Sequence, residues 1–279
     1  MSMTLVTTGL LQALILSFVA YGVMIPFRFL NFADLSAEGA YPLGGALCAS
    51  FLLSDLHPAL TLIASALIAG CLSMIVALIH VRLKVNTLLA GIIVSTMAYS
   101  VNLRIMEKPN IALFNKARLF SDTSMTLDGL ILLGLLLVMV LPFALFLRTE
   151  KGLQLRAIGL NPDFAKSQGI SIQKYTLLGL MIAGCYSGFG GALMVQYQSY
   201  MDISMGIGIV IHALAALMIG EAITGNATLH RQLMAPFLGA IVYQQIQGLA
   251  LSMGLAPSDL KFFTGAVVLM VIGLRCRRR

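Results

Sequence analysis

The sequence predicts an all-α polytopic membrane protein of about nine transmembrane helices, some of them discontinuous, with a weak inverted repeat. Hydrophobic residues make up 59% of the 279 residues and charged residues only 10%, far from the roughly 25% charge of a soluble domain. Apolar runs about long enough to cross a hydrocarbon core recur along the whole chain. We therefore treat residues 1–279 as a single transmembrane domain surrounded by membrane lipid.

Composition and spacing argue against other kinds of site. The net charge of +7 could indicate nucleic-acid binding, but the bases lie in short loops and form no continuous soluble face. No GxxxxGK[ST] segment is present, so ATP hydrolysis would need a separate subunit and we expect no bound cofactor. The cysteines and histidines lack the spacing of a disulfide framework or a metal site; they are Cys48, Cys71, Cys185, Cys276, His57, His80, His212 and His230.

The first two apolar runs differ in character. The first, roughly Leu5–Ile25, starts with no Lys or Arg, so we interpret it as a retained span and not as a cleaved signal peptide. The second, Phe29–Leu53, is interrupted by Asp34, Glu38 and Pro42. Acidic groups and prolines are tolerated at membrane depth only where they face protein or a water-filled cavity. This run is therefore predicted to be a discontinuous helix in the protein interior.

The later runs alternate with polar connections. A basic turn, residues 81–86, separates the third and fourth runs, and a polar segment, residues 107–126, precedes the fifth. The polar segment 148–174 separates the fifth from the sixth, and an arginine-rich tail follows the last. The runs are roughly Pro58–His80, Thr87–Met106, Leu127–Leu147, Tyr175–Tyr197, Gly206–Thr224, Leu233–Met253 and Leu260–Leu274.

Basic residues are unevenly divided between the two sides of the membrane. If the segment 148–174 is cytoplasmic, thirteen of the 18 Lys and Arg residues lie inside and five lie outside. Because cytoplasmic loops carry an excess of Lys and Arg, we predict an amino terminus outside and a carboxyl terminus in the cytoplasm.

A weak internal sequence repeat favours a transporter over a structural membrane protein. Asp34-Leu35-Ser36 precedes one glycine-broken run, and Asp202-Ile203-Ser204 precedes another. In the predicted orientation, the first segment follows the cytoplasmic end of a span and the second follows the external end of a span. Inverted repeats, whose broken helices meet near a substrate path, have this arrangement.

The polar segment 148–174 is predicted to contain a surface helix of about two turns. Asn161 is placed as its N-cap, Pro162 at its first position and Gly169 at its end. Gly159 is expected to allow a sharp turn before the cap. A helix this short is marginal in water, so we expect a neighbouring subunit to hold it.

Three segments of the chain carry a family resemblance. They read LNFADLSAEGAYPLGGAL, NTLLAGIIVSTMAYSVNLRIM and RAIGLNPDFAKSQGI. They resemble the permease subunits of bacterial ABC importers in the branched-chain amino acid and ribose permease superfamily, and within it the tryptophan/tyrosine-type permeases. The departures from the family pattern are Leu160, where a polar residue is usual, and Lys166, Ser167 and Gln168.

The resemblance implies partners and a docking site. It makes 148–174 a cytoplasmic coupling loop that docks on an ABC ATPase subunit, which would bind the ATP and Mg. It also implies a homodimer in the bacterial plasma (inner) membrane and a substrate-binding protein outside. The residues that it assigns to ATPase coupling are Arg156, Gly159, Asn161, Pro162, Ala165 and Gly169.

Polar side chains inside the runs are candidates for the translocation path. Ser95, Tyr99 and Asn102 stand at i, i+4 and i+7, which is one helical face, and Gln244 and Gln247 are three residues apart. The alternative is that they make interhelical hydrogen bonds, worth about 0.6 kcal/mol on average in membranes. The full set of path candidates is Asp34, Ser36, Glu38, Ser95, Tyr99, Asn102, Gln244 and Gln247.

We therefore predict the permease subunit of an ATP-binding cassette importer, not itself an enzyme. Its mostly apolar conduit favours a hydrophobic or aromatic amino acid as the solute. An ion-coupled secondary transporter is the alternative, because broken helices and inverted repeats would serve it equally well. A membrane-embedded enzyme is disfavoured, because the deep acids Asp34, Glu38 and Glu221 each lie near the end of a run and form no pair.

Overall fold

The fold comes from a computed structural model that describes residues 3–114, 116–120, 125–225 and 227–254, with isolated positions beyond them. Of the predicted ninth run, Leu260–Leu274, the structure describes only isolated positions, and the arginine tail lies outside the described residues.

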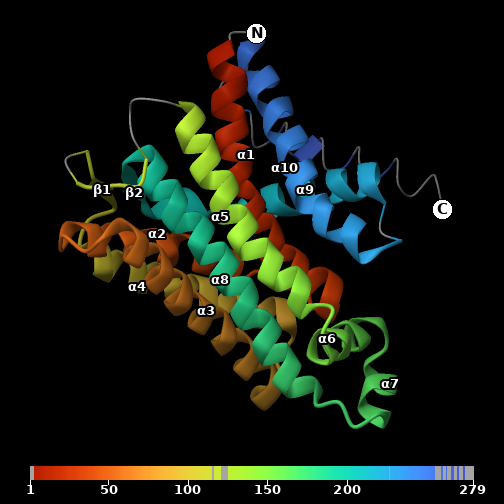
Figure 1. Ribbon diagram of the computed structural model, residues 1–279. Helices are drawn as coiled ribbons and strands as arrows, with labels where there is room; N and C mark the ends of the chain where they lie inside the picture. The colour runs from red at the N-terminus through yellow and green to blue at the C-terminus, as the bar shows by residue number, and fades with distance from the viewer. Residues whose placement is uncertain are drawn as a thin grey trace.

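Helices dominate the described chain, as predicted (Figure 1). Several begin where the sequence supplies a cap: the Asn86 side chain accepts a hydrogen bond of 3.0 Å from the Leu88 N–H, and the next helix starts at Thr87. The elements are α1 Met3–Met24, the π-helix η1 Ile25–Leu30, α2 Ala37–Leu53, α3 Pro58–Leu83, α4 Thr87–Met106, α5 Met125–Phe146, α6 Glu150–Leu160, α7 Pro162–Ser167, α8 Ile172–Gln198, the 3₁₀ turn η2 Ile203–Gly206, α9 Ile209–Thr224 and α10 Leu229–Ser252.

Six helical segments among the described residues are long and apolar enough to cross a membrane. They are Val6–Leu30, Pro58–Leu83, Thr87–Met106, Met125–Phe146, Ile172–Gln198 and Ile203–Thr224. Two further predicted runs also form helices, α2 and α10, but neither is among these six. Helix α2 has only 17 residues, and the glutamines of α10 lower its mean hydropathy. The predicted number of nine spans is thus not confirmed, although the membrane character is clear.

Helix α8 lies at the centre of the bundle, against α1, α2 and α3. Glycines on both sides of the contact let α2 and α8 approach closely: a Cβ added to Gly44 of α2 would lie 2.1 Å from the carbonyl oxygen of Gly188 of α8. Small residues at helix crossings are the usual means of close packing in membranes. In Figure 1 α10 runs beside α1, and α6 and α7 lie at the end of the bundle where α8 begins.

The opposite end of α8 carries a short β-ribbon, which the all-α prediction did not include. Strand β1, Asn110–Ala112, pairs antiparallel with β2, Tyr200–Asp202, so that Ile111 faces Met201. Each strand has three residues, which is too short for the alternating pattern that identifies strands in a sequence.

Candidate functional site

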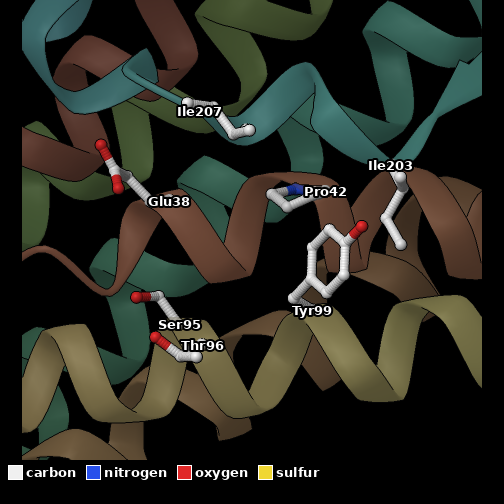
Figure 2. Close-up of a pocket in the computed structure, with 8 residues that line it drawn as sticks. Glu38, Pro42, Ser95, Thr96, Tyr99, Ile203 and Ile207 are labelled. Atoms are coloured by element: carbon white, nitrogen blue, oxygen red, sulfur yellow. The ribbon is translucent and has the colours of Figure 1, made fainter.

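A cavity of about 240 Å³ opens where α2, α4 and η2, the turn before α9, meet. Glu38 and Pro42 face it from successive turns of α2, and Tyr99 reaches it from α4 (Figure 2). The remaining lining residues are Ser95, Thr96, Ile203, Gly206 and Ile207. The cavity therefore offers one carboxylate, hydroxyl groups and apolar surface to a small solute.

Local hydrogen bonds fix the direction of α2 and so the position of Glu38. In the turn before α2, Asp34 Oδ1 accepts from the Ser36 N–H at 2.8 Å, and Asp34 Oδ2 accepts from the Ser36 hydroxyl at 2.6 Å. The Glu38 carboxylate accepts a hydrogen bond from the backbone N–H of Gly208, the N-cap residue of α9. A carboxylate at a helix amino terminus is favourable because the helix dipole is positive there. Glu38 thus joins α2 to the first turn of α9 at the edge of the cavity.

The second Asp-x-Ser sequence makes the same kind of turn. Asp202 Oδ1 accepts from both the N–H and the hydroxyl of Ser204, each at 2.7 Å. This turn leads into η2 and α9, as the first leads into α2. Both segments contribute to the cavity, since Glu38 and Ile203 line it.

The structure divides the predicted path residues among three environments. Glu38, Ser95 and Tyr99 meet in the cavity of Figure 2. Gln244 and Gln247 line a second cavity of about 150 Å³ between α1, α2, α8, α9 and α10. Asp34, Ser36 and Asn102 are buried and line neither cavity.

Both glutamines also bond to neighbouring side chains. Gln244 Nε2 donates to Gln12 Oε1 at 2.6 Å, across α10 and α1. Gln247 Nε2 donates to the Tyr243 hydroxyl at 2.9 Å within α10. The second cavity is therefore lined by side chains that already serve interhelical and intrahelical contacts.

The polar segment 148–174 forms two helices instead of the one expected. Thr149 Oγ1 accepts from the Gly152 N–H at 3.3 Å and caps α6, and Asn161 Oδ1 accepts from the Phe164 N–H at 3.0 Å and caps α7. Pro162 occupies the first position of α7, and Gly169 follows its end with a φ of +76°. The N-cap, proline and glycine signals were thus correct, whereas α6 was missed.

Gly159 does not form the sharp turn that the sequence suggested. It lies inside α6, where an added Cβ would be 2.5 Å from the Phe29 carbonyl oxygen of η1. Arg156 is half-buried in the same helix. Gly159 therefore permits close backbone contact between α6 and the end of the first span.

The surface of this helix pair is apolar in part. Leu160 is 86% exposed and Phe164 is 59% exposed, four residues apart. Ala165 is fully buried and so faces the protein, while Asn161 and Pro162 are exposed. A hollow of about 500 Å³ beside α7 is lined in part by Lys84, Lys166 and Gln173. The exposed apolar pair with basic neighbours has the composition of a protein docking surface.

Two charged residues that were not among the predicted site residues form a pair. The Arg28 guanidinium of η1 donates to both carboxylate oxygens of Glu221 near the end of α9, with an Nη2–Oε2 distance of 2.6 Å. The sequence analysis counted Arg28 only as one of the thirteen basic residues on the cytoplasmic side, and Glu221 only as a deep acid. Nothing in the spacing could join residues 193 positions apart.

Within the described ranges, no group of three His, Cys, Asp or Glu side chains is placed to hold a metal ion. The bundle of long apolar helices, the cavity between them and the helix pair at one end are the features of a membrane transport protein.

Comparison with known proteins gives the family. Residues 5–272 match the family described as branched-chain amino acid transport system, permease component. The chain is 34% identical over 259 residues to a tyrosine transport system permease protein of Clostridioides difficile, covering 92% of this chain and 87% of that one. The chain belongs to this family of ABC transporter permeases.

Other relatives widen the range of solutes. A nucleoside ABC transporter permease of Lactococcus lactis is 25% identical over 215 residues, covering 71% of this chain and 68% of that one. A solved structure described as a metal-chelate type ABC transporter, in an inward-facing conformation, has a TM-score of 0.54 at 14% identity, covering 99% of this chain and 85% of that one. At that identity the likeness shows the fold alone.

The close contact of α2 with α8 leads to a prediction. Gly44→Leu should abolish most transport, because even a Cβ added at this position would lie 2.1 Å from a backbone oxygen of α8. Overpacking of this kind destabilises a folded protein by about 1–3 kcal/mol. Membrane insertion should persist, since the substitution adds apolar surface. Uptake compared with the amount of protein in the membrane checks this, with Gly134→Leu as the control because no atom lies within 4 Å of a Cβ added there. Full uptake by Gly44→Leu would contradict the packing.

Proposed function

We propose that this chain is the transmembrane subunit of an ATP-binding cassette importer that takes up a small hydrophobic or aromatic amino acid. The single observation that carries the amino-acid assignment is the Glu38 carboxylate in the cavity lining. A carboxylate at membrane depth is costly unless paired, and the ammonium group of an amino acid would supply a counter-charge. A nucleoside carries no such cation, although nucleoside permeases are among the relatives.

The rest of the cavity lining also suits such a solute. Tyr99 offers an aromatic ring and a hydroxyl, Ile203 and Ile207 offer apolar surface, and Ser95 offers a hydroxyl. Sites that bind small molecules combine apolar walls with a few placed polar groups. The two Asp-x-Ser turns that lead into α2 and α9 support an inverted repeat around this cavity.

Coupling to ATP hydrolysis would run through α6 and α7. Permeases of this family lack an ATPase site of their own, so an ABC ATPase would dock on the apolar pair Leu160 and Phe164. A substrate-binding protein would deliver the solute at the opposite end of the bundle, and a second copy would complete a homodimer. ATP and Mg would bind on the ATPase subunit.

Uptake by the purified complex tests the proposal. The chain, reconstituted in liposomes with its ATPase and its binding protein, should accumulate an aromatic amino acid only when ATP is present on the ATPase side. Uptake that is driven by a proton or sodium gradient without ATP would instead establish the ion-coupled secondary transporter.

The charge distribution leads to a prediction of topology. A single cysteine that replaces Lys116 should react with a membrane-impermeant maleimide from outside the cell. Single cysteines that replace Lys166 or Arg279 should react only from the cytoplasmic side. The reason is that this orientation puts the excess of Lys and Arg in the cytoplasm. Labelling of intact cells and of inverted vesicles distinguishes the sides. Reaction of position 116 from the cytoplasm alone would show that the orientation is reversed.

A further inference from the structure

The contact between α6 and η1 places the proposed ATPase-docking helices directly against the first span. The backbone of α6 at Gly159 touches the backbone of η1 at Phe29 and Leu30, where an added Cβ would lie 2.5 Å from one oxygen and 3.1 Å from the next nitrogen. Since atoms at van der Waals contact cannot compress, a displacement of α6 toward η1 must move η1.

Helices α6 and α7 are joined so that they move together. Only Asn161 separates them, and its N–H donates to the Ala157 carbonyl of α6 while its carbonyl accepts from the Ala165 N–H of α7, both at 3.0 Å. Ala165 is fully buried. A force on the exposed face of α7 is therefore passed to α6 and from there to η1.

Arg28 connects η1 to α9 through its side chain. It immediately precedes Phe29, and its guanidinium is bound to both oxygens of Glu221, whose side chain is only 5% exposed. Bidentate arginine–carboxylate pairs are the strongest and most directional of such contacts. Glu221 lies in the last turns of α9, where the helix dipole disfavours a carboxylate. The residue is thus poorly suited to stabilise its own helix and well suited to bind Arg28.

The other end of α9 reaches the cavity. Gly208, the N-cap residue of α9, donates its N–H to Glu38, and Ile207 lines the cavity beside it. Helix α9 is also closely packed on α10: a Cβ added to Gly220 would lie 1.8 Å from the Ala235 carbonyl oxygen. Its 16 residues span about 24 Å at 1.5 Å per residue. A shift at Glu221 is therefore transmitted along a continuous helix to the wall of the cavity.

We propose that the Arg28–Glu221 ion pair is the mechanical link between the ATPase-docking helices and the solute cavity. This inference rests on the proposed function and specifies its coupling route. Arg28 and Glu221 are positioning residues, because neither belongs to the exposed pair Leu160 and Phe164 and neither is among the residues that line the cavity. The π-helical setting of Arg28 supports the assignment, since π-helical turns often occur at functional sites.

Neutralising both partners tests the link without leaving a buried charge alone. In Arg28→Gln/Glu221→Gln the two amides can still form a hydrogen bond, so thermal stability and the amount of co-purified ATPase should stay at the wild-type level. Solute transported per ATP hydrolysed should fall about tenfold, because the directional pair is lost. The single variant Glu221→Gln should show the same loss of transport per ATP.

A matched pair serves as the control. Lys116 and Asp55 form a second ion pair, with an Nζ–Oδ1 distance of 2.7 Å, on the connections that follow β1 and α2. Lys116→Gln/Asp55→Asn should leave transport per ATP unchanged. Wild-type transport per ATP in the Arg28/Glu221 double variant would overturn the link, and so would loss of the co-purified ATPase, which would make the pair part of the docking surface. Failure of the proposed function itself is distinguishable, because the wild-type complex would then show no ATP-dependent uptake.

Discussion

Phe164→Asp is expected to remove most of the ATPase subunit that co-purifies with this permease. Phe164 is 59% exposed on α7, and burying such a side chain at an interface contributes about 1.5–3 kcal/mol. Losing that burial and adding an unpaired charge should weaken binding by roughly tenfold or more, since each 1.4 kcal/mol is a factor of ten. Because more than half of the Phe164 side chain is exposed, the permease should fold and insert normally. Pull-down from membranes, with the ATPase quantified against the permease, measures the effect.

The choice of position comes from the structure. The family resemblance assigned Ala165 to ATPase coupling, but Ala165 is fully buried, so a bulky charged residue there would disrupt α7 and not just its surface. Phe114→Asp is the matched control, because Phe114 is 71% exposed and lies at the opposite end of the bundle. An unchanged amount of ATPase with Phe164→Asp would mean that the polar segment 148–174 only fixes topology.

Helix positions could be predicted well because each relies on local signals. Thr87–Met106 was predicted with the observed bounds, since Asn86 caps it and Glu107 ends it with a φ of +59°. Contacts between distant segments had no such signal. The first span continues to Leu30 as a π-helix, which no periodicity indicates. Helix α6 was missed because its apolar residues do not form a single stripe: Leu155 and Ile158 are buried, whereas Leu153 and Leu160 are exposed.

The candidate site was predictable only where one helix carries it. The i, i+4 spacing of Ser95 and Tyr99 placed both on one face, and both line the cavity. Asn102 continues that face but is buried outside the cavity, because its burial depends on helices that the spacing does not describe. Arg28 and Glu221 were not associated for the same reason. Pairings across the bundle are set by tertiary packing, which requires the fold.

Glu38→Gln is expected to reduce amino-acid uptake by about ten- to a hundredfold. Hydrogen bonds to charged groups contribute about 1.5–3 kcal/mol, which corresponds to that range at 1.4 kcal/mol per tenfold. Glutamine has nearly the same shape and retains an oxygen that can accept the Gly208 N–H, so α2 and α9 should stay joined. The bound ATPase and basal ATP hydrolysis should therefore be unchanged. Initial uptake rates at equal permease density give the measurement.

Two solutes and one control variant identify the cause of the loss. An aromatic acid without an amino group should be a poor solute for the wild type, and Glu38→Gln should not reduce its uptake further, because the lost contact is with the ammonium group. Glu107→Gln, an exposed change at the far end of α4, should leave amino-acid uptake at the wild-type rate. If Glu38→Gln lowered uptake of a nucleoside as much as that of the amino acid, the carboxylate would act through the α2–α9 contact and not on the solute. The cavity would then select by shape, and the charge of Glu38 would serve the junction of the two broken helices.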